Sequence, residues 1–138
     1  MYGDRVHYEN GQPTYTGDTV VKCFKDNGNG LLFRIVNNDE YRWAFYNDTT
    51  NYNMVVKVSF GKDSKVEPLM NTKTWRNERT AEFEFELHIA PTQTEMFIEG
   101  EPNGFKMVFT AEDMSTEGGD ARELSDHPLA TVAPIGRE

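Results

Sequence analysis

Cysteine, long apolar runs and basic residues are all scarce in this sequence. Cys23 is the only cysteine among the 138 residues, so the chain can form neither an internal disulfide nor a cysteine-rich metal site. No segment approaches the roughly 18 apolar residues that a membrane-spanning helix needs. The first residues also lack the apolar stretch of a secretory signal. As the sequence is written, we expect a soluble chain in a reducing compartment.

The shortage of positive charge excludes some partners. Against 14 Lys and Arg residues stand 23 Asp and Glu residues, which gives a net charge of −9. This balance argues against nucleic acid as a partner and against purely electrostatic binding to anionic lipid. The charge is also uneven, because residues 111–138 hold seven acidic residues, two basic residues and no aromatic residue.

The composition divides the chain into three parts. A hydrophobic content of 37% supports a folded core, and the length suits one domain. We expect a flexible N-terminal segment at residues 1–13, a compact β domain at 14–110, and an acidic disordered tail at 111–138.

Alternating apolar and polar residues predict the strands of this domain. Residues 52–60 and 81–89 alternate most clearly, and 41–46 and 31–36 follow the same period of two. Shorter runs near 18–24, 95–101 and 105–110 bring the number to seven. Without a convincing amphipathic helix, these runs predict an all-β fold, a compact antiparallel β-sandwich or flattened barrel of about seven or more short strands with disordered tails.

Turn residues suggest how the strands connect. Asn38-Asp39 is suited to a two-residue hairpin between 31–37 and 40–47, and Asn103-Gly104 to a type I′ hairpin between 95–101 and 105–110. The second hairpin would place Met96 or Phe97 opposite Phe109 or Met107. Residues 61–79 are predicted to form one long irregular connection, which is where binding residues often lie.

No arrangement of residues predicts catalysis. Cys23 is expected to be a small core residue, since it lies within an apolar strand. His7 and His127 fall in the expected tails, and His88 falls on the wet face of its strand. The sequence therefore predicts no catalytic residue, no metal site and no cofactor.

Two other patterns favour structural explanations. Glu82, Glu84 and Glu86 project from one face of a strand, so we expect a solvated face whose charges are met by Lys or Arg on the next strand. Asn47-Asp48-Thr49 satisfies the glycosylation sequon, which has no meaning without a signal peptide.

Trp75 is the candidate binding residue. It stands in the expected long connection with Arg76 and Arg79 close by. Trp75 either caps one end of the core or is an exposed aromatic that binds a protein or lipid partner, because Trp and Arg are enriched at interfaces. We take Trp75, Arg76 and Arg79 as the candidate partner-binding or lipid-binding residues.

Two strings of residues carry a resemblance to a known family. They are residues 31–37 (LLFRIVN) and 43–49 (WAFYNDT), and the similarity continues through 58–61 and 99–105. The chain resembles the N-terminal domain of the kinetoplastid calpain-related proteins. A single copy of this domain with no protease domain attached is similar to the small acylated members of the family in the flagellum.

The resemblance implies a non-proteolytic calpain-like domain on the cytoplasmic face of the flagellar membrane, held there by N-terminal myristate and palmitate. The net charge agrees on one point, since an acidic protein needs acyl chains to stay at an anionic membrane. In this chain Tyr2 occupies the place of the acceptor glycine, Gly3 cannot substitute for it, and no cysteine follows closely. No lipidation residue is therefore present, and we expect Met1 to about Asp4 to be a cloning remnant that replaces the native acylated end.

Three function classes follow in order of preference. The first is a structural or adaptor protein, a monomer that reaches the membrane through its acyl chains and binds a protein or lipid partner that the sequence does not identify. The second is a lipid-binding or fatty-acid-binding module with an apolar cleft between its sheets. An enzyme ranks last, because no nucleophile, base and metal cluster come together.

Overall fold

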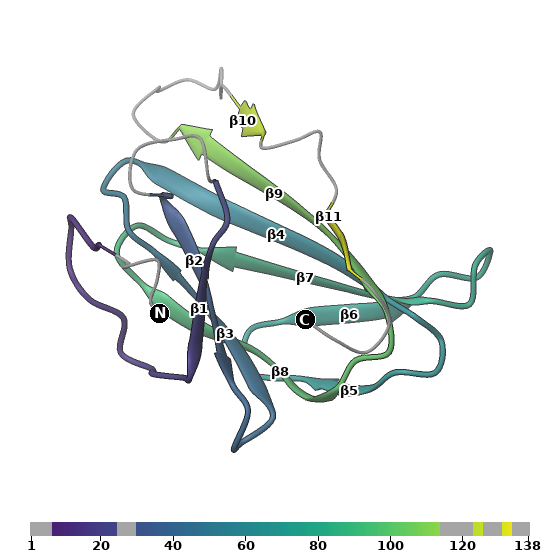
Figure 1. Ribbon diagram of the computed structural model, residues 1–138. Coiled ribbons are helices and arrows are strands. Elements are labelled where there is room, and N and C mark those ends of the chain that lie inside the picture. Colours follow the sequence, from purple (N-terminus) through teal and green to yellow (C-terminus); the bar gives the residue numbers. More distant parts are fainter. Residues whose placement is uncertain (1–6, 25–29, 114–122, 126–130, 134–138) are drawn as a thin grey trace.

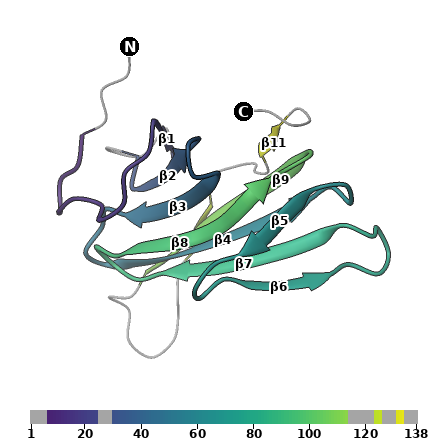
Figure 2. The same ribbon diagram turned by 90° about the horizontal axis from the view of Figure 1, so that it is seen from below.

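Two antiparallel β-sheets packed face to face make up the protein (Figures 1 and 2). The computed structural model describes residues 7–24, 30–113, 123–125 and 131–133. In that part of the chain every regular element is a strand. The strands are β1 (Thr19–Lys22), β2 (Leu32–Asn37), β3 (Arg42–Asn47), β4 (Tyr52–Phe60), β5 (Lys65–Pro68), β6 (Lys73–Arg76), β7 (Phe83–Ile89), β8 (Thr94–Glu101), β9 (Phe105–Asp113), β10 (Glu123–Ser125) and β11 (Thr131–Ala133).

The strand order confirms the predicted sandwich. Sheet A has the order β1-β2-β3-β8-β5, and sheet B has the order β10-β9-β4-β7-β6, with β11 also pairing with β9. Neither sheet closes on itself, so the fold is an open sandwich rather than a barrel.

The two clearest alternations become the centre of sheet B. Met54, Val56 and Val58 of β4 lie opposite Ile89, Leu87 and Phe85 of β7, and all six side chains are buried. Of the residues between them, Lys57 and His88 are exposed and Glu86 is partly exposed, as a half-buried strand requires, whereas Val55 is buried as well.

Aromatic side chains from both sheets fill the space between them. Phe60 lies edge-on to Phe85 at 5.0 Å between ring centroids, and Trp43 lies edge-on to Phe105 at the same separation. Phe45 and Phe97, neighbours in sheet A, are 5.3 Å apart. Such edge-to-face pairs add specific geometry to the large apolar area that these rings bury.

The hairpin predicted at Asn103-Gly104 is wrong. β8 pairs with β3 and β5 in sheet A, while β9 pairs with β4 in sheet B, so the chain crosses between the sheets at this turn. Met96 therefore lies opposite Ala44, and Met107 lies opposite Val58.

The turn at Asn103-Gly104 is instead hydrogen-bonded to the connection between β4 and β5, where the chain also passes from one sheet to the other. The backbone N–H of Gly61 donates to the carbonyl oxygen of Gly104 at 2.9 Å, and the N–H of Asn103 donates to Ser64 Oγ at 2.6 Å. An Asn-Gly pair favours a tight turn but does not decide which strands pair beyond it.

The predicted pairing of residues 31–37 with 40–47 is confirmed, with a longer turn than expected. Asn37 lies opposite Arg42, so four residues rather than two connect β2 and β3. The side-chain oxygen of Asn37 accepts hydrogen bonds from the N–H groups of Asp39 and Glu40 at 3.0 and 2.9 Å. Tyr41 closes the turn with a positive φ of 58°.

The long irregular connection predicted at residues 61–79 is also wrong, since it contains β5 and β6. β5 pairs with β8 at the edge of sheet A, and β6 pairs with β7 at the edge of sheet B. Each strand is four residues long and largely exposed. Strands this short and polar show no apolar period, so they could not be recognised from the pattern of apolar residues.

Segments on both sides of the expected domain contact the sheets. Tyr8 and Tyr15 pack on sheet A, β9 continues to Asp113, and β10 and β11 pair with β9. The expected cloning remnant at Met1 to Asp4, His127 and most of the expected acidic tail lie outside the described residues.

Candidate functional site

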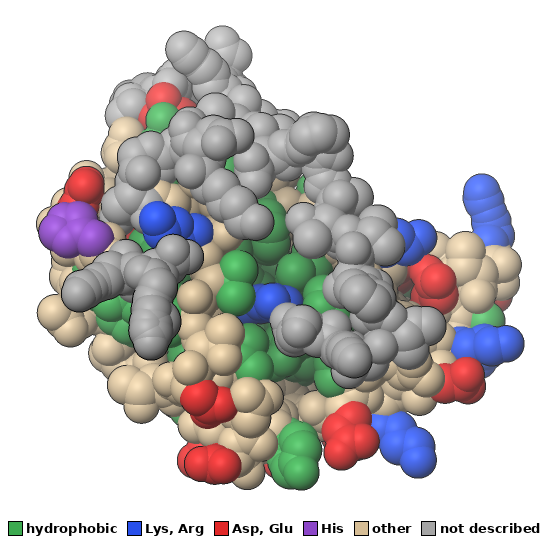
Figure 3. Space-filling model, viewed as in Figure 1, with side chains coloured by type: hydrophobic (Ala, Val, Ile, Leu, Met, Phe, Trp, Pro, Cys, Tyr) green, Lys and Arg blue, Asp and Glu red, His purple; other side chains and the backbone are tan. Residues whose placement is uncertain are grey.

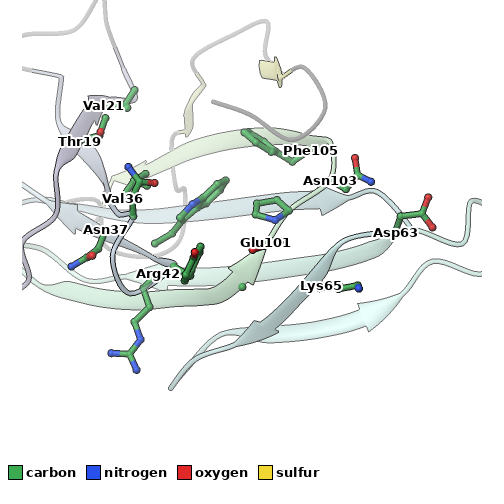
Figure 4. A pocket seen from close by; sticks show the side chains of 15 residues that line it. Thr19, Val21, Val36, Asn37, Arg42, Asp63, Lys65, Glu101, Asn103 and Phe105 are labelled. Carbon is green, nitrogen blue, oxygen red and sulfur yellow. The ribbon is translucent and has the colours of Figure 1, made fainter.

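A cleft of about 1020 Å³ opens at the end of the sandwich where the chain crosses between the sheets (Figure 4). Its floor is apolar and includes Val36, Trp43 and Phe105, each at most 6% exposed. Charged side chains stand around it, with Arg42 on β3 and Lys65 on β5. The remaining residues that line the cleft are Thr19, Val21, Asn37, Asn38, Tyr41, Asp63, Gly100, Glu101, Pro102 and Asn103.

A buried cation lies beneath this floor. The side chain of Arg34 is 5% exposed, and its guanidinium carbon is 4.5 Å from the ring centroid of Trp43 and 5.7 Å from that of Phe105. Its Nη1 approaches the sulfur of Met107 at 3.8 Å. The aromatic faces stabilise the charge by cation–π interaction. An apolar floor with positive charge near it suits an acyl chain that ends in a carboxylate.

The outer face of sheet A is covered by an N-terminal arm, residues 7–18. Phe33, Ile35, Ala44 and Tyr46 form a second buried cluster on this face, apart from the core between the sheets. From the arm, Tyr8 lies edge-on to Phe33 at 5.0 Å and to Tyr46 at 5.4 Å. Because β2 and β3 are apolar on both faces, they need a cover on the side away from sheet B.

The carboxylate of Asp48 holds the start of the arm on the sheet. Asp48 accepts hydrogen bonds from the backbone N–H groups of Glu9 at 2.6 Å and Asn10 at 2.9 Å, and from the hydroxyl of Tyr46 at 2.9 Å. The side-chain amide of Asn10 donates to the Asp48 carbonyl oxygen at 2.8 Å. Hydrogen bonds to a carboxylate are stronger than neutral ones, so Asp48 is the anchor of the arm.

The arm and its anchor shift the titration of three tyrosines. Burial, and then the hydrogen bond to Asp48, raise the pKa of Tyr46. Burial and the Asp48 charge raise the pKa of Tyr8. Burial raises the pKa of Tyr15 to about 12, with help from its hydrogen bond to Glu40 at 2.6 Å. All three hydroxyls therefore favour the neutral state.

The sequon residues are part of the same turn and are structural. Asn47 is completely buried, and its side-chain nitrogen donates to the carbonyl oxygens of Tyr52 at 2.8 Å and Ile89 at 2.9 Å. Thr49 Oγ1 donates to Asn47 Oδ1 at 2.7 Å. An amide held in this way ties β3 to the start of β4 and the end of β7, and it is inaccessible to a glycosyl donor.

The candidate binding residues Trp75, Arg76 and Arg79 lie at the edge of sheet B and do not line the cleft. Trp75 and Arg76 belong to β6, and Trp75 is 50% exposed. Arg79 lies in the turn after β6, where its N–H donates to Asn77 Oδ1 at 2.9 Å. The structure thus places the three residues near one another along one edge, on a strand and its turn rather than in a loop.

The residues tested for catalysis lie in different environments. Cys23 is buried, as predicted, with its Sγ 3.9 Å from the Val21 carbonyl oxygen. His88 is exposed on β7, and its Nε2 is 2.7 Å from a carboxylate oxygen of Glu86. His7 lies exposed at the start of the arm.

The row of glutamates is only partly solvated. Glu84 accepts hydrogen bonds from Ser59 Oγ at 2.7 Å and from the Asn77 amide at 3.1 Å, so its partners are not the expected Lys or Arg. Lys57 and Lys73 do lie opposite Glu86 on the two neighbouring strands.

No group of three or more His, Cys, Asp or Glu side chains in the part of the chain that the structure describes is arranged to hold a metal ion. No helix there is long and apolar enough to cross a membrane.

The sequence offered an apolar cleft as an alternative but did not identify its residues, and it did not indicate Arg34 or the Asp48 anchor. The cleft is built from residues of six strands and the connections between them, so no single segment of the sequence reveals it. One signal for the arm was present, because apolar residues on both faces of 31–36 require cover on both sides.

Comparison with known proteins gives a family and two similar structures. Residues 8–114 match a domain of unknown function, DUF1935. The chain is similar to SMP-1, the Small Myristoylated Protein from Leishmania major, with 46% identity, coverage of 81% of this chain and 84% of that chain, and a TM-score of 0.76. A Leishmania major hypothetical protein is 28% identical, with coverage of 88% and 94% and a TM-score of 0.66. No curated protein shows significant sequence similarity.

The similarity to SMP-1 agrees with the resemblance to small acylated proteins found in the sequence. The matched residues include Tyr8, Glu9 and Asn10 at one end and all of β9 at the other. The arm that Asp48 anchors therefore lies within the matched domain.

Proposed function

The chain belongs to the DUF1935 family, and from this premise we propose that it is a non-catalytic adaptor protein held at a membrane by acylation of its native N-terminus. The proposed location is the cytoplasmic face of the flagellar membrane, with myristate and palmitate as the anchors. The domain would serve there as a calpain-like module without proteolytic activity. It would present its surface to a partner rather than carry out a reaction.

The similarity to a small myristoylated protein is the observation that carries this proposal. Identity of 46% over four-fifths of the chain is high enough to make a shared mode of attachment a reasonable expectation. The charge supports it, since a protein with a net charge of −9 is repelled by anionic lipid. One myristoyl chain gives only marginal binding, and a second chain makes attachment stable.

The arm gives the attachment a defined geometry. Tyr8 packs on the outer face of sheet A, and Asp48 holds the backbone of Glu9 and Asn10. An acyl chain on the N-terminal side of Tyr8 would therefore leave the domain at a fixed place. The adaptor would have a preferred orientation on the membrane instead of hanging from a free linker.

Placement of the reactive residues supports a non-catalytic role. A thiol nucleophile needs a partly exposed site with a base beside it. Cys23 is 4% exposed in the core cluster, whereas His88 is exposed on β7 and contacts Glu86.

Intact-mass analysis of the protein purified from kinetoplastid cells that express its own gene tests the attachment. We expect the mass to exceed that of the unmodified chain by one myristoyl and one palmitoyl group, and a fluorescent fusion at the C-terminus to mark the flagellum. Replacing the acceptor glycine with alanine should release the fusion into the cytoplasm. An unmodified mass, or unchanged flagellar location of the variant, would overturn the proposal.

A second function is favoured by one observation, the cleft between the sheets. Its floor of Val36, Trp43 and Phe105 is apolar, and Lys65 stands beside it to meet a carboxylate. Arg42 is already paired with Glu40 at 3.6 Å and Glu99 at 3.4 Å. A fatty acid, or the protein's own acyl chain, would fit a site of this kind.

Titration with laurate, followed by amide chemical shifts, separates the two functions. A fatty-acid module predicts saturable shifts around Trp43 and Phe105 that are lost in Trp43→Ala, with Val108→Ala on the opposite surface as the control. Absence of shifts at those amides would exclude the cleft as a fatty-acid site and leave the adaptor.

A further inference from the structure

Sheet B ends in an open edge at β6. All four residues of this strand are exposed, and among the described residues β7 is its only strand neighbour. In an antiparallel strand every second residue directs its N–H and C=O away from a given neighbour. β6 therefore presents unpaired backbone groups along its outer side, which is a template for another strand.

The side chains of this edge are basic and aromatic in an acidic protein. Between Pro68 and Thr80 there are three basic residues and one acidic residue, while the whole chain carries −9. The basic residues are Lys73, Arg76 and Arg79, and in the part of the chain that the structure describes none of them makes an ion pair.

Carboxylates next to β6 are engaged elsewhere. Glu84, opposite Trp75, accepts hydrogen bonds from Ser59 and Asn77, and Glu86 contacts His88 at 2.7 Å. Lys73 lies opposite Glu86, but Arg76 lies opposite Phe83, so the charges of Arg76 and Arg79 are left to a ligand.

The need to protect an open sheet edge from unwanted strand pairing does not explain why Trp75 is exposed there. A short strand with lysine at the edge is a common defence against unwanted pairing, and Lys73 fits that role. A tryptophan that is 50% exposed does the opposite, because it adds apolar area that favours association.

The position of β6 favours a protein over a membrane. The arm lies on the outer face of sheet A, and β6 is well separated from it in both Figure 1 and Figure 2. Figure 3 shows basic and acidic side chains mixed at the margin of the molecule on the side of the β6–β7 turn. If the membrane lies at the arm, as the proposed function requires, β6 remains accessible from the cytoplasm.

We infer that β6 binds an extended acidic segment of a partner protein by strand addition. The backbone of the segment pairs with the open side of β6. Its carboxylates meet Arg76 and Arg79, and its apolar side chains lie on the opposite face of the strand, where one of them packs on Trp75. This inference rests on the proposed adaptor function and names the chemistry of its partner.

A peptide of alternating glutamate and valine is the probe, and the same peptide with lysine in place of glutamate is its matched control. With the unacylated protein, we expect the acidic peptide alone to shift the amide signals of residues 73–76 and to slow their hydrogen exchange. Double replacement R76E/R79E should weaken binding about tenfold or more, and W75A should do the same. Tyr41→Ala removes another exposed aromatic, remote from β6, and should bind normally.

Three results would overturn the inference. They are equal binding of both peptides, acidic-peptide shifts that avoid β6, and no shift at all. Vesicles of phosphatidylserine that shift the β6 amides in a Trp75-dependent way, without acidic-peptide binding, would make the edge a lipid contact instead. Because the peptide is tested on unacylated protein, failure here is distinguishable from failure of acylation in cells.

Discussion

At the scale of single residues, Asp48 joins the arm to the sandwich. Its carboxylate receives two backbone N–H groups of the arm and the Tyr46 hydroxyl, and its side chain lies in a buried position. Removing this charged acceptor leaves the buried Tyr46 hydroxyl without its partner and frees two partly buried N–H groups, which costs more than the hydrogen bonds contributed.

Asp48→Ala should lower the free energy of unfolding by about 3 kcal/mol. Amide hydrogen exchange of Glu9 and Asn10 should become faster, because their backbone donors lose the acceptor. Urea unfolding and exchange measurements test this, with Asp39→Ala in the exposed β2–β3 turn as the control. Unchanged exchange at Glu9 and Asn10 would show that the arm is held by packing alone.

Tyrosine titration predicts a loss of stability at high pH. The pKa of Tyr46 is raised by burial and the Asp48 hydrogen bond, and that of Tyr15 is raised to about 12. Groups whose pKa is higher in the folded state stabilise it fully below the unfolded value, about 10, and lose that effect as the pH rises through the folded value. Stability should therefore fall from about pH 10 upward.

Tyr46→Phe tests the assignment, since it removes one titrating proton. The variant should be less stable at neutral pH, because the bond to Asp48 is lost, but its stability should fall less steeply above pH 10. An identical slope in the variant and the parent would mean that Tyr46 does not contribute.

Phe85 tests the register of sheet B. This residue is 3% exposed and lies edge-on to Phe60 at 5.0 Å. Phe85→Ala should cost about 3–5 kcal/mol as a large-to-small core change. Val108→Ala, at an exposed position of β9 in the same sheet, should cost less than about 1 kcal/mol. Equal melting temperatures for Phe85→Ala and the parent would contradict the register.

At the scale of elements, the sequence predicts the strands that are half buried and fails on those that are exposed. Apolar and polar residues alternate in β4 and β7 because one face of each strand lies in the core. The sequence pattern therefore predicts both strands and the face of each that is buried. β5 and β6 are exposed strands of four residues, and their pairing depends on β8 and β7. No local pattern could reveal them.

The sequence also led to a wrong prediction of which strands pair with each other. Asn103-Gly104 has the local chemistry of a hairpin, but β8 and β9 belong to opposite sheets. The apolar faces of β8 and β9 are buried equally well whether the two strands pair in one sheet or pack against each other from opposite sheets. Only the long-range contacts of Gly104 with Gly61 and of Asn103 with Ser64 settle the path of the chain.

Gly100 controls the pairing of β5 with β8. It has a positive φ of 132°, and a Cβ there would collide with the carbonyl oxygen of Lys65. Its N–H also donates to the Tyr41 carbonyl oxygen at 2.8 Å. Gly100→Ala should therefore cost about 2 kcal/mol or more and speed amide exchange in β5. The neighbouring exposed residue gives the control, Glu101→Ala, and equal stability of the two variants would contradict this role.

At the scale of the whole molecule, the sandwich separates two surfaces. The arm covers the outer face of sheet A, while β6 ends sheet B with Trp75, Arg76 and Arg79 exposed. Net charge and patterning were readable from the sequence, including the pairing of Trp75 with basic neighbours. The separation of Trp75 and its basic neighbours from the arm could not be predicted from the sequence, because it depends on how the two sheets stack.

The net charge of the whole molecule determines how the folded domain interacts with a membrane. With a net charge of −9 and three basic residues gathered at β6, the folded domain has little electrostatic attraction for anionic lipid. Membrane binding is therefore expected to come from the acyl chains, and the folded surface remains available to a protein partner.

Vesicle flotation of acylated and unacylated protein tests this central claim most directly. Vesicles of phosphatidylcholine with phosphatidylserine at physiological ionic strength are mixed with each form and centrifuged through a density gradient. The account predicts that the acylated protein floats with the vesicles and the unacylated protein stays at the bottom. Flotation of the unacylated protein to the same extent would contradict it.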